Sequence, residues 1–92
     1  MLKLVFSARI QKDLKLMQKR RYDIAKFKLT VKLLAQNSNM PEQFRDHPLK
    51  GSWAGFRECH IEPDWLLIYR INDEESVLNL TRTGTHSDLF GR

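Results

Sequence analysis

The chain has a single cysteine, Cys59, among its 92 residues. One cysteine cannot form a disulfide within the chain, which excludes an extracellular disulfide scaffold and is typical of a reducing compartment. No apolar run approaches the roughly 18 residues of a membrane span. The apolar part of MLKLVFSARI is also too short for a signal peptide. We therefore expect a soluble cytoplasmic protein with no membrane partner.

Glycine and proline are scarce as well, with four and three residues. There is no glycine-rich phosphate loop, no internal repeat and no low-complexity segment. The composition, 41% apolar and 29% charged, is ordinary for a folded globular protein. A chain of this length supports one modest core, so we expect a single domain over residues 1–92.

Acidic residues are nearly missing from the first third of the chain. Residues 1–32 contain ten lysines and arginines but only two acids, Asp13 and Asp23. Such an excess favours a polyanion such as nucleic acid, because phosphate contacts release bound counterions. An acidic protein would bind the same surface, and a solvated helix face that keeps the protein soluble is the third explanation. The charge by itself leaves all three open.

Two amphipathic helices are predicted in the basic third. Ser7 and Asp23 are suited to cap their N-termini, since each side chain can accept from a free backbone N–H. Apolar residues then recur at helical spacing: Ile10, Leu14 and Met17 in the first helix, and Ile24, Phe27, Val31 and Leu34 in the second. The pattern predicts an antiparallel helical hairpin that covers one face of a sheet.

The strands are expected at Leu2–Phe6, Trp53–Ile61, Trp65–Ile71 and Val77–Thr83, with a final helical turn in HSDLF. The resulting order, β-α-α-β-β-β, predicts an α+β fold. In that fold the two N-terminal helices pack on an antiparallel sheet of about four strands.

The candidate site centres on three histidines, His47, His60 and His86. In the strand Trp53–Ile61, alternation places Phe56, Glu58 and His60 on one face, so Glu58 can orient the His60 ring. Asp64 begins the returning strand and is expected close to His60 across the turn. Near the end of the last strand, Arg82 offers a bidentate fork for a phosphate.

Two other chemistries use some of these residues. His47, His60 and Asp64 could form a mixed metal site, but their spacing matches no metal-specific pattern. Cys59 could act as a nucleophile, but alternation turns it away from His60, as expected of a small buried residue. We therefore expect neither a metal nor another cofactor.

The remaining chemistry is metal-independent cleavage of RNA. The 2′-hydroxyl of RNA can attack the neighbouring phosphate if a base removes its proton and an acid protonates the leaving 5′-oxygen. Positive charge beside the phosphate stabilises the transition state. Histidine can serve as either acid or base near neutral pH.

The segments DHPLKGSWAGFRECHIEPDWLLIYR and RTGTHSDLF closely resemble the YafQ-like toxins of the RelE-like superfamily, and the likeness extends over nearly the whole chain. The resemblance implies a RelE-like (microbial RNase-like) fold and a ribosome-dependent mRNA endoribonuclease, that is, an mRNA interferase. It implies roles at the site for His47, His60, Asp64, His86 and Phe90. The family has an aspartate at the position of Glu58.

The same resemblance implies the partners. An acidic, DinJ-like antitoxin would wrap the toxin, operator DNA would be met only through that complex, and the basic face would contact ribosomal RNA. The cations expected to contact RNA are Lys12, Lys15, Lys19, Arg20, Arg21 and Lys50. We expect His60 and His86 to transfer protons with assistance from His47. The rival interpretation is a non-catalytic RNA- or protein-binding module on the same scaffold.

Overall fold

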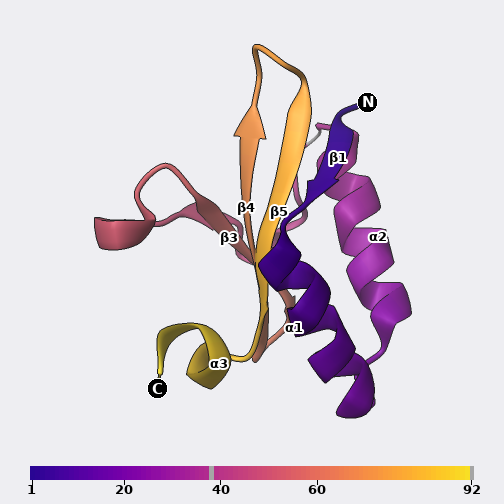
Figure 1. The fold of residues 1–92 in the computed structure, drawn as a ribbon. Coiled ribbons are helices and arrows are strands. Elements are labelled where there is room, and N and C mark those ends of the chain that lie inside the picture. Colours follow the sequence, from indigo (N-terminus) through magenta and orange to yellow (C-terminus); the bar gives the residue numbers. More distant parts are fainter. Residues whose placement is uncertain (38, 92) are drawn as a thin grey trace.

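The computed structural model describes residues 1–37 and 39–91. Its elements follow the chain in the order β1 (Lys3–Phe6), α1 (Ala8–Lys19), α2 (Ile24–Ala35), η1 (Glu42–Phe44), β2 (His47–Pro48), η2 (Gly51–Trp53), β3 (Arg57–Glu62), β4 (Trp65–Asn72), β5 (Val77–Gly84) and α3 (His86–Phe90). The predicted α+β class is confirmed (Figure 1). No helix in the described part of the chain is long and apolar enough to cross a membrane.

The sheet has the strand order β1-β5-β4-β3-β2. The pairs β2–β3, β3–β4 and β4–β5 are antiparallel, whereas β1 is parallel to β5. The sheet is therefore mixed and has five strands rather than about four, since the two-residue strand β2 extends it beyond β3. The predicted antiparallel sheet is wrong for β1, which is parallel to β5, because an apolar run in a sequence carries no information about strand direction.

Both predicted helix caps are confirmed. The Ser7 side chain accepts from the backbone N–H of Ile10 at 2.9 Å, and Asp23 accepts from Ala25 at 3.0 Å. The apolar faces of α1 and α2 then pack on one face of the sheet (Figure 1). Their core includes Ile10, Met17, Phe27, Val31 and Leu34 from the helices and Cys59, Trp65, Leu67, Tyr69, Leu78 and Leu80 from the strands.

The predicted strand at Trp53–Ile61 begins too early. Trp53 belongs to η2, and the ladder of β3 starts at Arg57. Gly55 has φ +93°, a left-handed conformation that breaks an extended chain and that glycine adopts without strain. The chain therefore turns before it joins the sheet.

The second face of the sheet is opposite the helices. Along β4, Trp65, Leu67 and Tyr69 belong to the core, so alternation places Leu66, Ile68 and Arg70 on the other face. In register with Ile68 lie Glu58 on β3 and Arg82 on β5, and His47 on β2 is opposite Glu58. The row His47–Glu58–Ile68–Arg82 runs across this face, which we call the histidine face.

Candidate active site

Glu58 is the centre of the histidine face. Only 5% of its surface is exposed. Its Oε1 lies 3.4 Å from His60 Nε2 and 3.7 Å from His47 Nε2. Since Glu58 and His60 are two residues apart on β3, the predicted sharing of one face is confirmed. A nearly buried carboxylate between two imidazoles favours the orientation in which both Nε2 atoms face it.

The other ring nitrogen of each of these histidines lies beside a backbone carbonyl. His47 Nδ1 is 2.7 Å from the Arg45 oxygen, and His60 Nδ1 is 3.3 Å from the Pro63 oxygen. A carbonyl oxygen can only accept, so Nδ1–H is the donor in both contacts. Nε2 of each ring is then the nitrogen that faces the Glu58 carboxylate.

The loop before His47 is held by a part-buried polar network. Arg57 donates to Asp46 Oδ1 from Nε at 2.8 Å, with Nη2 at 2.7 Å, and the Tyr69 hydroxyl donates to Asp46 Oδ2. Burial and the Asp46 carboxylate raise the pKa of Tyr69, so the hydroxyl keeps its proton. The network fixes Asp46, and with it the adjacent His47. Sequence reasoning did not identify these three residues.

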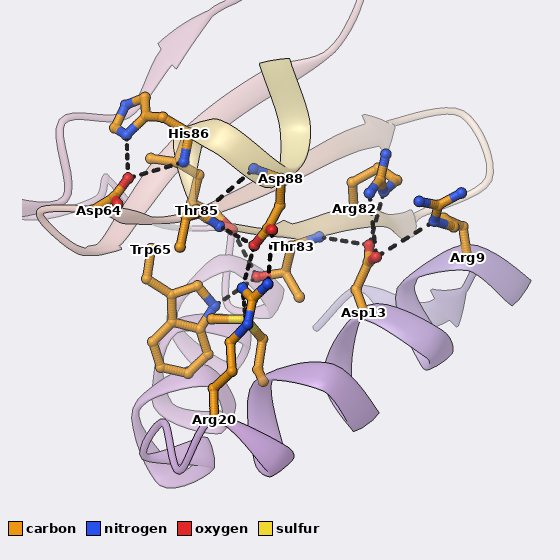
Figure 2. Close-up of polar contacts among 12 residues, drawn as sticks. Arg9, Asp13, Arg20, Asp64, Trp65, Arg82, Thr83, Thr85, His86 and Asp88 are labelled. Carbon is orange, nitrogen blue, oxygen red and sulfur yellow. Dashed lines mark hydrogen bonds and ion pairs between the residues drawn. The ribbon is translucent and has the colours of Figure 1, made fainter. Parts of the chain in front are cut away.

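His86 is paired with Asp64. Its backbone N–H donates to Asp64 Oδ1 at 2.9 Å, and its ring Nδ1–H donates to the same oxygen at 2.5 Å (Figure 2). The backbone N–H, followed by the ring, holds the pKa of Asp64 below its usual value, because both contacts stabilise the carboxylate. With Nδ1 engaged, Nε2 of His86 is available for proton transfer, as in a histidine oriented by a carboxylate.

The three imidazoles form one cluster. The His60 ring centre lies 6.4 Å from that of His47 and 5.8 Å from that of His86. Asp64 was predicted to lie beside His60, but its hydrogen bonds go to His86. The chain has a register shift between His60 and Glu62, and α3 begins with His86 close to the β3–β4 turn. The site therefore has two histidine–carboxylate units, built around Glu58 and Asp64.

Arg82 is held by a carboxylate on α1 that the sequence did not indicate. Arg82 Nε donates to Asp13 Oδ2 at 2.8 Å and Nη2 to Oδ1 at 3.3 Å (Figure 2). Asp13 is 7% exposed and also accepts from the Thr83 backbone at 3.2 Å and from Arg9 at 3.5 Å. Much of the Arg82 charge is thus compensated inside the protein, and its predicted phosphate contact stays a prediction.

Helix α3 is fixed at its first turn. Thr85 and Asp88 form a capping box, the pattern that THSD in the sequence could have revealed. Arg20 at the end of α1 binds Asp88 through two nitrogens, at 2.6 and 3.0 Å (Figure 2). The Arg20 hydrogen bond holds the pKa of Asp88 at about 2. Phe90 lies four residues after His86 in α3, so both residues occupy one side of this short helix.

The predicted RNA-contacting cations are distributed over two regions. Lys12, Lys15 and Lys19 are exposed on α1, Arg20 and Arg21 follow that helix, and Lys50 is exposed just before η2. Arg20 differs from the other five because its guanidinium is engaged by Asp88. Their binding of RNA stays a prediction.

The two alternative chemistries can be compared with the geometry. Cys59 is fully buried on the core face, and burial raises the pKa of its thiol, which disfavours the nucleophilic thiolate. Among residues 1–37 and 39–91, no group of three or more histidine, cysteine, aspartate or glutamate side chains is arranged to hold a metal ion. The three histidines instead contact two carboxylates, Glu58 and Asp64.

Comparisons with known proteins identify the family. The family of bacterial YafQ toxins of type II toxin–antitoxin systems matches residues 2–91. The mRNA interferase toxin YafQ of Escherichia coli K12 is 48% identical over 87 residues, covering 94% of this chain and 92% of that protein.

Two solved structures extend the likeness to three dimensions. A chain of the E. coli DinJ–YafQ complex has a TM-score of 0.90 at 44% identity, with 99% of this chain and 100% of that one covered. A metal-bound toxin from Helicobacter pylori has a TM-score of 0.92 at 42% identity, with coverages of 98% and 100%. The predicted RelE-like fold is confirmed by this agreement. The chain belongs to the YafQ family of bacterial toxins of type II toxin–antitoxin systems.

Proposed function

We propose that this toxin is an endoribonuclease that cleaves messenger RNA in the ribosomal A site by acid–base chemistry without a metal. Its relative in E. coli is named an mRNA interferase, which supports the substrate class. The observation that carries the mechanism is the cluster of three imidazoles on one face. In each of them Nδ1 contacts an oxygen, so Nε2 is the nitrogen that would carry the proton, and in His47 and His60 it faces Glu58.

The reaction needs no water and no external reactant. A base takes the proton of the 2′-hydroxyl, and the 2′-oxygen attacks the adjacent phosphorus. The bond from phosphorus to the 5′-oxygen then breaks, and an acid protonates that oxygen. The products are a 2′,3′-cyclic phosphate and a 5′-hydroxyl. Two imidazoles of opposite protonation suffice, because the neutral ring takes the proton of the 2′-hydroxyl and the protonated ring gives its own proton to the 5′-oxygen.

The residues divide into proton carriers and groups that hold them. His60 and His86, with ring centres 5.8 Å apart, carry the protons, and His47 assists. Glu58 and Asp64 orient these rings through the contacts described above. Arg82, held by Asp13 near the end of β5, would contact the phosphate, and Phe90 on α3 would orient a base or the C-terminal segment.

The partners follow from the family. The E. coli relative is seen in a complex with DinJ, which supports an acidic, DinJ-like antitoxin as the partner of this chain. Lys12, Lys15, Lys19, Arg21 and Lys50, with Arg20 in its ion pair, would contact ribosomal RNA and mRNA. Operator DNA would be met through the toxin–antitoxin complex, in the cytoplasm. A single domain over residues 1–92 suffices for these functions.

Induced expression of the wild type and of His86→Ala, with mRNA 5′ ends mapped, tests the proposal. The wild type should produce new 5′ ends inside coding regions, and the variant should produce none. A non-catalytic binding module would inhibit translation without new ends. Growth arrest with intact messages in the wild-type culture would therefore contradict the enzyme.

A further inference from the structure

A second row of side chains lies on the histidine face, beside the row His47–Glu58–Ile68–Arg82. Leu78 and Leu80 of β5 point into the core, so Asn79 between them faces the opposite side. Asn79 is in register with Arg70 on β4 and with Val5 on β1. Arg57 is paired with Tyr69, so Phe56, just before β3, comes opposite Arg70. The four residues form a row parallel to His47–Glu58–Ile68–Arg82.

This row lines a groove of about 320 Å³. Its wall comprises Val5, Ser7, Phe56, Arg70, Asn79, Leu80 and Thr81, which include one cation and no carboxylate. The groove beside His60, by comparison, is lined by both Arg45 and Glu62, and Glu62 forms an ion pair with Lys26. An anionic strand leaving the histidines is thus attracted toward Arg70 and meets no negative side chain in this groove.

Arg70 differs from the arginines that hold the fold together. Arg20, Arg57 and Arg82 are each bound to a carboxylate, at 2.6, 2.7 and 2.8 Å. Arg70 is exposed, and within the described part of the chain it forms no salt bridge. Its guanidinium is therefore available to a phosphate without first breaking an internal pair.

The aromatic wall of the groove suits a nucleobase. Phe56 is partly exposed and is supported from its other side by Trp53, whose ring meets it edge-to-face at 5.4 Å. A supported ring of this kind offers a stacking surface to an unpaired base. Asn79, partly exposed in the same wall, has both a donor and an acceptor for the edge of that base.

We propose that Phe56, Arg70 and Asn79 form a subsite for a nucleotide about two positions from the cleaved bond. Phe56 stacks on its base, Asn79 bonds the base edge and Arg70 binds its phosphate. His60 is in register with Leu66, four residues before Arg70 on β4, so about 13 Å along the strand separates Arg70 from the proton carriers, comparable with two steps between phosphates of single-stranded RNA. The inference rests on the proposed function, because it assigns a second contact to the same substrate.

Single-turnover cleavage of ribosome-bound mRNA tests the subsite through its concentration dependence. Arg70→Ala should raise the half-saturating concentration of toxin about tenfold, while the cleavage rate at saturation changes little. Arg70→Lys should recover only part of that loss, because it keeps the charge without the fork. Lys28→Ala, an exposed cation on α2 and away from this face, is the matched control and should leave both constants unchanged. Equal effects of Arg70→Ala and Lys28→Ala would overturn the assignment.

An abasic nucleotide placed two positions from the cleaved bond, on one side or the other, tests the stacking partner. At one of the two positions, loss of the base should reduce cleavage by the wild type about tenfold. At that position Phe56→Leu should show no further loss, whereas Phe56→Tyr should behave as the wild type. If the loss caused by the abasic nucleotide and the loss caused by Phe56→Leu multiply, the base and Phe56 are not in contact. That result would overturn the subsite. Absence of any cleavage by the wild type would instead contradict the proposed function and is measured in the same experiment.

Discussion

Asp64 positions His86 through one oxygen that accepts two hydrogen bonds, from the backbone and from the ring. Asp64→Asn keeps the size of the side chain but replaces the carboxylate that fixes Nδ1–H. A carboxylate that orients a histidine in this way typically contributes about 10–100-fold to activity, so we expect the rate of cleavage to fall by that factor. Asp64 is exposed, so the melting temperature should stay close to that of the wild type.

The measurement is the cleavage rate beside a thermal unfolding curve for each protein. Asp73→Asn, in the exposed β4–β5 turn, is the matched control and should change neither quantity. A fully active Asp64→Asn protein would show that the contact with His86 has no part in catalysis.

At the scale of single residues, strand alternation was informative and long-range pairing was not. Glu58 and His60 could be placed together because both lie on one strand with a period of two. The Asp64–His86 pair and the Asp13–Arg82 pair join residues 22 and 69 positions apart, and neither pair follows from local spacing. The sequence therefore does not reveal that Asp13 is the partner of Arg82.

At the scale of elements, α3 carries His86 and depends on the ion pair between Arg20 and Asp88. The Arg20 guanidinium lowers the pKa of Asp88 to about 2, whereas an unfolded aspartate titrates near 3.9. A lowered folded-state pKa means that this stabilisation is complete above about pH 4 and is lost as pH falls toward 2. The pair is partly exposed and screened by solvent, so its contribution to the free energy of unfolding should be small.

Asp88→Asn should therefore unfold at a lower temperature than the wild type at pH 6, and the difference should narrow as pH falls from about 4 to 2. Thermal unfolding at several pH values measures both effects. A difference in unfolding temperature that stays constant down to pH 2 would mean that the negative charge of Asp88 is not the source of the stabilisation.

The exposed lysines of α1 provide the second prediction at this scale. If Lys12, Lys15 and Lys19 contact ribosomal RNA, reversing them to Glu should weaken ribosome binding and flatten its dependence on salt by about one unit of slope per lost contact. Reversing Lys3, Lys28 and Lys32 changes the net charge equally on β1 and α2 and is the control. Identical losses in both triple variants would show that net charge, rather than α1, determines binding.

The starts of α1 and α2 were the most predictable features of the fold. Ser7 and Asp23 cap the helices as expected, because capping depends on neighbouring residues alone. The start of β3 was misplaced because the left-handed turn at Gly55 separates Trp53 from the sheet. The two-residue strand β2 and the direction of β1 are set by pairing with distant strands, which no local pattern encodes.

At the scale of the whole molecule, the proposed reaction needs no metal, although a similar toxin from H. pylori is metal-bound. In that proposal, three imidazoles held by two carboxylates provide an acid and a base without a cation. Chelation of free metal should therefore leave the rate unchanged within about twofold, provided that magnesium sufficient for intact ribosomes is kept. A loss of activity that zinc or copper restores, and magnesium does not, would contradict this.

The most direct test of the central claim is the single-turnover cleavage rate of His60→Ala and His86→Ala, measured on ribosome-bound mRNA with the folding of each protein checked by thermal unfolding. Losing a general acid or base should reduce the rate by about 10²–10⁴. Both variants should remain folded and bind ribosomes, because neither side chain belongs to the core. A folded variant that cleaves at nearly the wild-type rate, or one that is inactive only because it is unfolded, would contradict the assignment of these histidines to proton transfer.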